Sequence, residues 1–278
     1  MITADFIIGG FAGVISRTFT APIELIKMQQ QNKYLPNTNI KSVIQKEGII
    51  GLWKGNYVNS IRIFPQMAIN YSFYQFFKKN MINYINIKNN NLVNFLSGTG
   101  AGIISMTSIY PLENIRSRLA LQTNKDHYNG IIDIIRRTKI RSLYNGLTMS
   151  IIGFAPYNAL NFTFYEALKS YSNKNKYLND INPFVKQILS GGFAGTFAVS
   201  FTYPTDLIRR RLQLQGFDKL VPKYNGIIDC SKKIYNTEGI RGFYRGLLPC
   251  YIKIFPSLAI QFYMIELMKQ TYYGSVNT

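Results

Sequence analysis

The stretch of sequence that decides the fold is Pro204-Thr205-Asp206-Leu207-Ile208-Arg209, in which an acid follows a proline by two residues and a base follows the acid by three. The same layout recurs at 22–27 and at 111–116. The three prolines are 89 residues apart (22 to 111) and 93 residues apart (111 to 204). Three copies at nearly constant spacing indicate an internal triplication.

A second motif follows each proline at a similar distance. Residues 47–55 read Glu-Gly-x4-Trp-Lys-Gly and residues 238–246 read Glu-Gly-x4-Tyr-Arg-Gly, whereas 144–146 keep only Tyr-Asn-Gly. Two motifs repeated together favour one domain over 1–278, made of repeats at about 1–88, 89–180 and 181–278.

Long charge-free runs predict membrane helices. Residues 93–112, 142–165, 187–205 and 63–77 carry no charge, over 20, 24, 19 and 15 residues, and about 20 mainly apolar residues span a bilayer. The mean hydropathy of −0.02 fits a bundle around a wet cavity, in which one face of each helix stays polar. A soluble array of helical repeats is the alternative, but it would rarely contain such runs.

We therefore expect an all-α membrane protein with pseudo-threefold symmetry. The six transmembrane helices are predicted at 5–32, 57–83, 92–122, 147–172, 184–215 and 248–273. Short amphipathic helices are expected near 38–46, 130–138 and 227–236, between the odd and the even helix of each repeat.

The charge balance narrows the function. The 32 basic and 13 acidic residues give a net charge of +19, which favours nucleic acid, an anionic membrane surface or small anionic substrates. Because the basic residues lie between apolar runs, we expect a membrane and no nucleic-acid partner.

Cys230 and Cys250 are expected to be reduced thiols. The sequence shows no Gly-rich phosphate loop, Cys/His cluster or nucleophile elbow, so we expect no enzyme, metal or cofactor. No cleavable leader is apparent before the first apolar run.

The two repeated motifs resemble those of the mitochondrial carrier family, over nearly the whole chain. Proline kinks a helix, so kinks at Pro22, Pro111 and Pro204 would bring three acids and three bases to one axis. The resemblance implies a matrix gate of ion pairs, braced by Gln31 and Gln213, while Ala120 leaves the second repeat without a brace. The expected pairs are Glu24–Arg116, Glu113–Arg209 and Asp206–Lys27. The alternative is that these charges only hold the bundle together.

The family also places a cytoplasmic gate on the even helices, with an aromatic residue and an acid followed by a base. Tyr165, Glu166 and Lys169 match fully, Glu266 and Lys269 lack the aromatic residue, and Gln75 replaces the acid before Lys78. The implied pairs are Glu166–Lys269, Glu266–Lys78 and a neutral Gln75–Lys169. We expect this gate to be weaker than the matrix gate.

Three basic residues at mid-membrane depth are candidate substrate ligands. Arg17 precedes Pro22 by five residues, and Arg62 and Lys253 each precede a proline by three. Each would cost about 2.5–3.5 kcal/mol facing lipid, so we expect all three in a water-filled cavity, where they would select a polyanion. The alternatives are that their side chains reach the membrane surface or contact cardiolipin.

The residues around these cations resemble particular carriers. The pattern Gly55-Asn56-x-x-Asn59-x-x-Arg62-x-Phe64-Pro65 is similar to ADP/ATP carriers, and Ser16-Arg17-Thr18 is similar to ADP/ATP, ATP-Mg/phosphate and coenzyme A carriers. The resemblance places an adenine base at Gly153, Phe154 and Tyr157. Leu-Gln-Leu after the arginines at 209–211 resembles coenzyme A carriers more than strict ADP/ATP exchangers, which have three methionines there.

We expect alternating-access transport of an adenine nucleotide or nucleotide-like cofactor (ATP/ADP, ATP-Mg/phosphate or coenzyme A). The expected location is the mitochondrial inner membrane, or that of a mitochondrion-related organelle, with a monomer in contact with cardiolipin. The alternatives are a carrier of another anion, such as phosphate or a carboxylate, and a non-transporting membrane scaffold. The exact substrate, its direction and exchange versus net uptake stay open.

Overall fold

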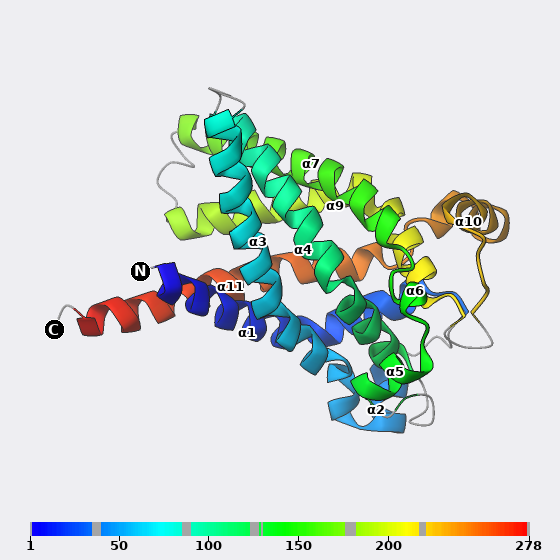
Figure 1. The fold of residues 1–278 in the computed structure, drawn as a ribbon. Helices are drawn as coiled ribbons and strands as arrows, with labels where there is room; N and C mark the ends of the chain where they lie inside the picture. The colour runs from blue at the N-terminus through cyan, green and yellow to red at the C-terminus, as the bar shows by residue number, and fades with distance from the viewer. Residues whose placement is uncertain are drawn as a thin grey trace.

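The structure is a computed structural model that describes residues 2–34, 40–84, 90–122, 128, 130–175, 182–216 and 221–276. Its main elements are six long helices (Figure 1). Each begins and ends within three residues of its predicted range, so the predicted all-α class is confirmed. They are α1 (Ile2–Gln31), α3 (Asn56–Tyr84), α4 (Asn90–Leu121), α7 (Leu147–Lys174), α9 (Pro183–Leu214) and α11 (Leu247–Val276).

Short helices lie between the odd and the even helix of each repeat. The first repeat has α2 (Ile40–Glu47) and the 3₁₀ helix η1 (Ile49–Trp53), the second has α5 (Ile131–Arg137) and α6 (Ile140–Leu143), and the third has α10 (Ile227–Gly242). They lie at the end of the bundle opposite the two termini (Figure 1). The predicted range 38–46 starts on residues outside the described part.

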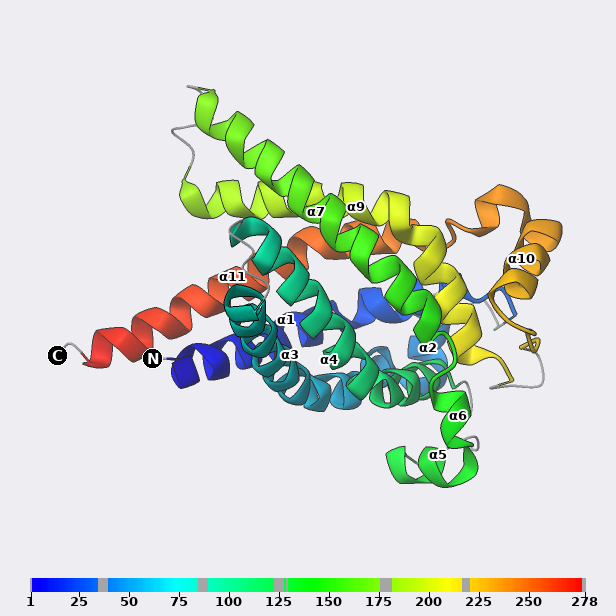
Figure 2. The same ribbon diagram turned by 45° about the horizontal axis from the view of Figure 1, so that its top comes forward.

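The long helices pack most extensively across repeat boundaries. Helix α3 lies along α4, α7 along α9, and α1 along α11, which closes the ring (Figures 1 and 2). Apolar side chains on the outside, such as Phe19, Phe201 and Leu248, are 69%, 63% and 68% exposed, which suits contact with lipid rather than water. By length and composition, α1, α4 and α11 contain candidate membrane spans at 4–31, 92–121 and 247–272.

A proline of the repeated motif lies inside the first long helix of each repeat, that is, inside α1, α4 and α9. Proline has no N–H, so it leaves the carbonyl four residues earlier without its helical partner. For Pro22 this is the carbonyl of Thr18, and the indole Nε1 of Trp53 donates to it at 2.8 Å. Such replacement partners make proline tolerable in a membrane helix, and Figure 2 shows how α9 changes direction along its length.

The glycine that ends each second motif explains why the two motifs occur together. Gly55, Gly146 and Gly246 have φ angles of 75°, 85° and 82°, a region that favours glycine. A Cβ atom on Gly146 would lie 2.7 Å from the carbonyl oxygen of Arg209, and one on Gly55 would lie 2.9 Å from that of Arg116. Each glycine thus lets a loop approach the backbone of a predicted gate base in the next repeat.

We expect Gly146→Ala to lower the free energy of unfolding strongly. The left-handed backbone costs a non-glycine residue about 1–2 kcal/mol, and overpacking against the Arg209 backbone costs about 1–3 kcal/mol more. Gly216→Ala is the matched control, because Gly216 also has a positive φ, of 65°, but its Cβ would meet only the flexible Lys223 side chain, 3.3 Å away. Equal melting temperatures for the two variants, followed by circular dichroism in detergent, would contradict the role of the close approach.

Candidate functional site

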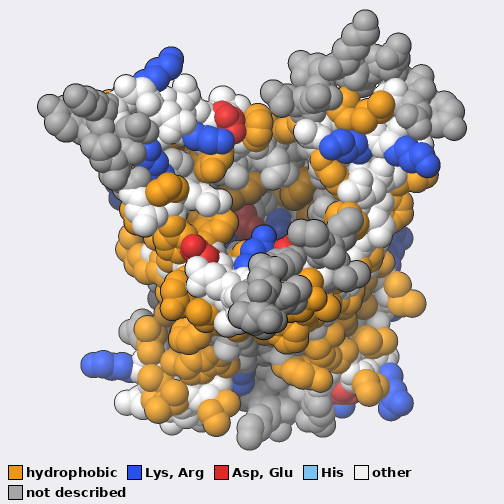
Figure 3. All heavy atoms as spheres, turned by 90° about the vertical axis from the view of Figure 1, so that its left-hand side faces the viewer, with side chains coloured by type: hydrophobic (Ala, Val, Ile, Leu, Met, Phe, Trp, Pro, Cys, Tyr) orange, Lys and Arg blue, Asp and Glu red, His pale blue; other side chains and the backbone are white. Residues whose placement is uncertain are grey.

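A cavity of about 1400 Å³ lies inside the bundle and is lined by residues of α1, α3, α4, α9 and α11. It opens at the end where the termini lie, and Figure 3 shows the hollow with basic and acidic side chains inside it. Basic side chains outnumber acidic ones in its lining, so the cavity attracts anions. The basic residues are Arg17, Lys27, Arg62, Arg116, Arg209, Arg210 and Lys253, and the acidic residues are Asp5, Glu24, Glu113 and Asp206.

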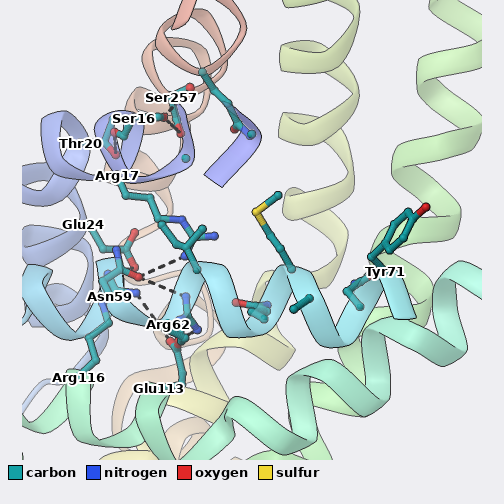
Figure 4. Close-up of a pocket in the computed structure, with 18 of the residues that line it drawn as sticks. Ser16, Arg17, Thr20, Glu24, Asn59, Arg62, Tyr71, Glu113, Arg116 and Ser257 are labelled. Atoms are coloured by element: carbon teal, nitrogen blue, oxygen red, sulfur yellow. Dashed lines mark hydrogen bonds and ion pairs between the residues drawn. The ribbon is translucent and has the colours of Figure 1, made fainter. Parts of the chain in front are cut away.

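The three predicted substrate cations all line this cavity rather than the lipid-facing surface. Arg17 on α1 and Arg62 on α3 each donate a hydrogen bond of 3.3 Å to Oδ1 of Asn59 (Figure 4). Asn59 is 3% exposed, and its amide oxygen holds two like charges near each other. Sequence analysis gave Asn59 no role, although its spacing of three residues from Arg62 places both on one helix face.

The six predicted matrix-gate charges meet at the closed end of the cavity. Lys27 Nζ lies 2.8 Å from Asp206 Oδ2, Arg209 NH2 lies 3.5 Å from Glu113 Oε1, and Arg116 NH2 lies 3.7 Å from Glu24 Oε1. Each pair joins the first long helices of two different repeats (α1, α4 or α9), so the three pairs form a ring across this end. Only the Lys27–Asp206 pair is short.

The two glutamines predicted as braces contact different groups. Gln31 Nε2 donates to Asp206 Oδ2 at 3.1 Å and to the Tyr203 hydroxyl at 3.2 Å, so it supports the short gate pair. Gln213 Oε1 instead accepts a hydrogen bond of 3.0 Å from Arg210 NH1. Gln213 therefore contacts the neighbouring arginine rather than the Arg209–Glu113 pair.

Two cavity cations contact matrix-gate acids, which sequence analysis did not predict. Lys253 Nζ lies 2.7 Å from Glu24 Oε2, and Arg62 NH1 forms a direct ion pair with Glu113 Oε2 (Figure 4). The Oε1 atom of Glu113 also lies 3.8 Å from Arg210 NH2 and 3.9 Å from Arg116 NH1. Arg210, which sequence analysis left without a role, was detectable only as the middle residue of the arginine run 209–211.

The predicted cytoplasmic-gate residues lie apart at the open end. No ion pair joins any two of the six in the described part of the chain, and Lys269 Nζ lies 3.3 Å from Asp5 Oδ1 instead. Five of them are exposed and Lys78 is half-buried. The cavity is open at the end where these residues lie and closed at the end of the predicted matrix gate, so the cytoplasmic pairs stay a prediction for the opposite conformation. The six residues are Gln75, Lys78, Glu166, Lys169, Glu266 and Lys269.

The predicted base-binding residues line a different space. Gly153, Phe154 and Tyr157 border a pocket of about 240 Å³ formed by residues of α1, α4, α7, α9 and α11. The side chain of Thr205 fills the room beside Gly153, so the expected slot is occupied in this conformation. The pocket adjoins the large cavity, since Lys27, Asp206 and Arg209 line both.

The two cysteines are buried and free. Burial raises the pKa of the Cys230 thiol to about 12, so this residue is protonated at neutral pH. A protonated thiol is a poor nucleophile and a poor metal ligand.

Comparisons with known proteins agree with this architecture. A family profile described as mitochondrial carrier protein matches residues 1–85, 88–176 and 181–276. The chain is 34% identical over 282 residues to "Mitochondrial substrate carrier family protein A" of Dictyostelium discoideum, covering 94% of this chain and 83% of that protein.

The names of two further relatives state a substrate. The human "Mitochondrial adenyl nucleotide antiporter SLC25A24" is 34% identical, over 95% of this chain and 57% of that protein. The Arabidopsis thaliana "Mitochondrial adenine nucleotide transporter ADNT1" is 33% identical, over 94% of this chain and 84% of that protein. The chain thus spans little more than half the length of the human relative. With three matched repeats, it belongs to the mitochondrial carrier family, whose members are transporters of the mitochondrial inner membrane rather than enzymes.

Proposed function

We propose that this protein transports an adenine nucleotide or a nucleotide-like cofactor by alternating access. The observation that carries the proposal is the convergence of Arg17, Arg62 and Lys253 in one water-accessible cavity with excess positive charge. Guanidinium and ammonium groups bind phosphate oxygens through charge-assisted hydrogen bonds. The names of two relatives, an adenyl nucleotide antiporter and an adenine nucleotide transporter, support the same substrate class.

The site residues take separate parts in this proposal. Arg17, Arg62 and Lys253 bind the phosphates, while Gly153, Phe154 and Tyr157 hold the base. The small pocket supports the second assignment because it adjoins the cavity and is lined by three aromatic residues, Phe154, Tyr157 and Tyr203, and aromatic rings can stack on a base. Thr205 must move for the base to enter.

The gates must be weak enough for substrate binding to open them. The gate charges are largely buried, and the desolvation of buried charges offsets much of their mutual attraction, so the net free energy that holds the gate closed is modest. A substrate that binds the two conformations with different affinity can shift a balance of this size. In this proposal the matrix-gate pairs close one end of the cavity, and the six cytoplasmic-gate residues close the other after the switch.

Exchange assays test the proposal. The purified protein is reconstituted in liposomes loaded with ATP, and the uptake of labelled ATP, ADP, coenzyme A and phosphate is measured. We expect uptake of at least one adenine compound. If none enters while a carboxylate or an amino acid does, the proposed substrate class is wrong, and if no solute enters a membrane scaffold is favoured.

A carrier of a smaller anion, such as inorganic phosphate, is the second candidate. The observation that favours it is the Thr205 side chain, which fills the slot beside Gly153, so that this conformation offers an anion the cations of the large cavity but no room for a base at Gly153. The variant Gly153→Trp separates the two candidates, because a tryptophan in the small pocket blocks a base and not a phosphate. Phosphate uptake that persists in this variant favours the second candidate.

A further inference from the structure

Two carboxylates of the matrix gate lie closer to cavity cations than to their own gate partners. Glu24 lies 2.7 Å from Lys253 and 3.7 Å from Arg116. Glu113 forms a direct ion pair with Arg62, whereas its distance to Arg209 is 3.5 Å. Asp206 differs, since its 2.8 Å contact is with the gate base Lys27.

We propose that Glu24 and Glu113 act as internal substitutes for substrate phosphates, so that an incoming polyanion must displace them from Lys253 and Arg62. This inference rests on the proposed function, in which these two cations bind phosphate. Carboxylate and phosphate oxygens accept the same charge-assisted hydrogen bonds from lysine and arginine. A cation that is paired with a carboxylate is therefore available to phosphate only after an exchange of partners.

Of the three predicted substrate cations, Arg17 alone forms no ion pair with a residue of the described part of the chain, so an anion can reach it without such an exchange. Arg17 NH1 donates a hydrogen bond of 3.3 Å to the neutral amide oxygen of Asn59. Figure 4 shows Arg17, Asn59 and Arg62 close together. A phosphate held by Arg17 lies next to Arg62, where it can compete with Glu113.

The exchange makes Glu24 and Glu113 determinants of specificity. A terminal phosphate group carries a charge of about −1.5 to −2 at neutral pH, whereas each carboxylate carries a single negative charge. A ligand with two phosphate groups replaces both carboxylates and gains electrostatic attraction at the cation that holds its terminal group. A monocarboxylate gains nothing from the exchange, and a monophosphate can replace only one of the two acids.

The exchange also links binding to the gate. Lys253 ties α11 to α1 through Glu24, and Arg62 ties α3 to α4 through Glu113. When phosphate takes over these two cations, the acids keep their longer contacts, which are with Arg116 for Glu24 and with Arg116, Arg209 and Arg210 for Glu113. Substrate binding thereby removes two links that hold the even helices to the closed end.

The test compares Glu24→Gln with Asp206→Asn. Each variant removes one negative charge from the cavity lining, but only Glu24→Gln frees a predicted phosphate ligand. Binding of inorganic pyrophosphate and of ADP to the purified protein is measured by titration calorimetry. We expect Glu24→Gln to bind pyrophosphate about tenfold more tightly than the wild type, and Asp206→Asn to change the affinity much less.

A double-mutant cycle with Lys253→Gln makes the test specific. In the Lys253→Gln background, Glu24→Gln is expected to leave the pyrophosphate affinity unchanged, because the cation that it frees is gone. Unchanged or weaker binding by Glu24→Gln alone, or equal tightening by Asp206→Asn, would overturn the inference. Should Glu24→Gln fail to fold, Glu24→Asp keeps the charge and withdraws the carboxylate, with a smaller tightening expected.

The two probes separate this inference from the proposed function. If pyrophosphate behaves as expected and ADP does not bind, the nucleotide assignment fails and the internal competition stands. If ADP binds and is transported while Glu24→Gln and Glu24→Asp show no tightening, the internal competition alone is wrong.

Discussion

Arg62→Gln is expected to reduce ADP uptake by proteoliposomes about 30-fold or more. Arg62 lies between the cavity and the gate, since it donates to Asn59 and pairs with Glu113. Loss of a charged partner in a desolvated site costs about 2–5 kcal/mol, and 1.4 kcal/mol is a factor of ten. Glu113 still faces Arg116, Arg209 and Arg210 in this variant, so the melting temperature should change much less than the uptake.

Lys79→Gln is the matched control, because it removes one positive charge from an exposed position of the same helix, α3. We expect nearly normal uptake from this variant. Arg62→Lys should recover only part of the activity, because an ammonium group cannot reproduce the planar fork of a guanidinium. Equal uptake by Arg62→Gln and Lys79→Gln would show that Arg62 has no part in substrate binding.

The largest stability effect is expected from Glu238→Ala. The Glu238 carboxylate accepts two hydrogen bonds from Arg211, at 2.5 Å from NH1 and 3.0 Å from NH2, and the Arg211 side chain is 1% exposed. Removing one partner of a buried pair leaves an uncompensated charge and costs about 3–5 kcal/mol. We therefore expect a much lower melting temperature by circular dichroism.

Arg245→Ala serves as the control on the same carboxylate. Arg245 Nε lies 3.2 Å from Glu238 Oε2, but its side chain is 43% exposed, so this contact should contribute about 1 kcal/mol or less. Since neither Arg211 nor Glu238 lines the cavity, folded Glu238→Ala protein should bind anions with normal affinity. A melting temperature equal to that of Arg245→Ala would contradict the prediction.

The second and third repeats differ at the position of Glu238, and this difference can be read from the sequence. The equivalent of Glu238, seven residues before Arg245, is Thr138, seven before Asn145, in the reduced second motif. There Arg118 donates to Asn114 Oδ1 at 2.8 Å and to Thr138 Oγ1 at 3.3 Å. In the second repeat, two neutral oxygens thus take the place of the carboxylate. An alignment of the three copies of the second motif shows this loss of the acid.

The helices could be predicted because their signals are local. Charge-free runs mark α3, α4, α7 and α9, the repeated proline motif marks α1, and the threefold repeat accounts for α11. The boundaries shift by at most three residues. The gate pairs came from the resemblance to the carrier family, and the threefold repeat of the motif is consistent with a ring of three such pairs. Neither inference required knowledge of how far a side chain reaches.

The contacts of Lys253 and Arg62 with the gate acids could not be predicted in this way. Lys253 and Glu24 are 229 residues apart, and Arg62 and Glu113 are 51 apart. Whether such side chains meet depends on the angles between helices and on the reach of long, flexible side chains across a cavity. The same holds for Gly153, whose slot is filled by Thr205 of a neighbouring helix.

The first and the last long helices are packed against each other, and Ser16 Oγ donates to the backbone oxygen of Ser257 at 2.7 Å across 241 residues. Contacts so distant along the chain are slow to form. During synthesis, α1 leaves the ribosome long before its neighbour α11 exists, so one flank of α1 waits without its partner. We expect chains that stop short of α11 to remain open on that side, which makes completion of the barrel the last event in its assembly.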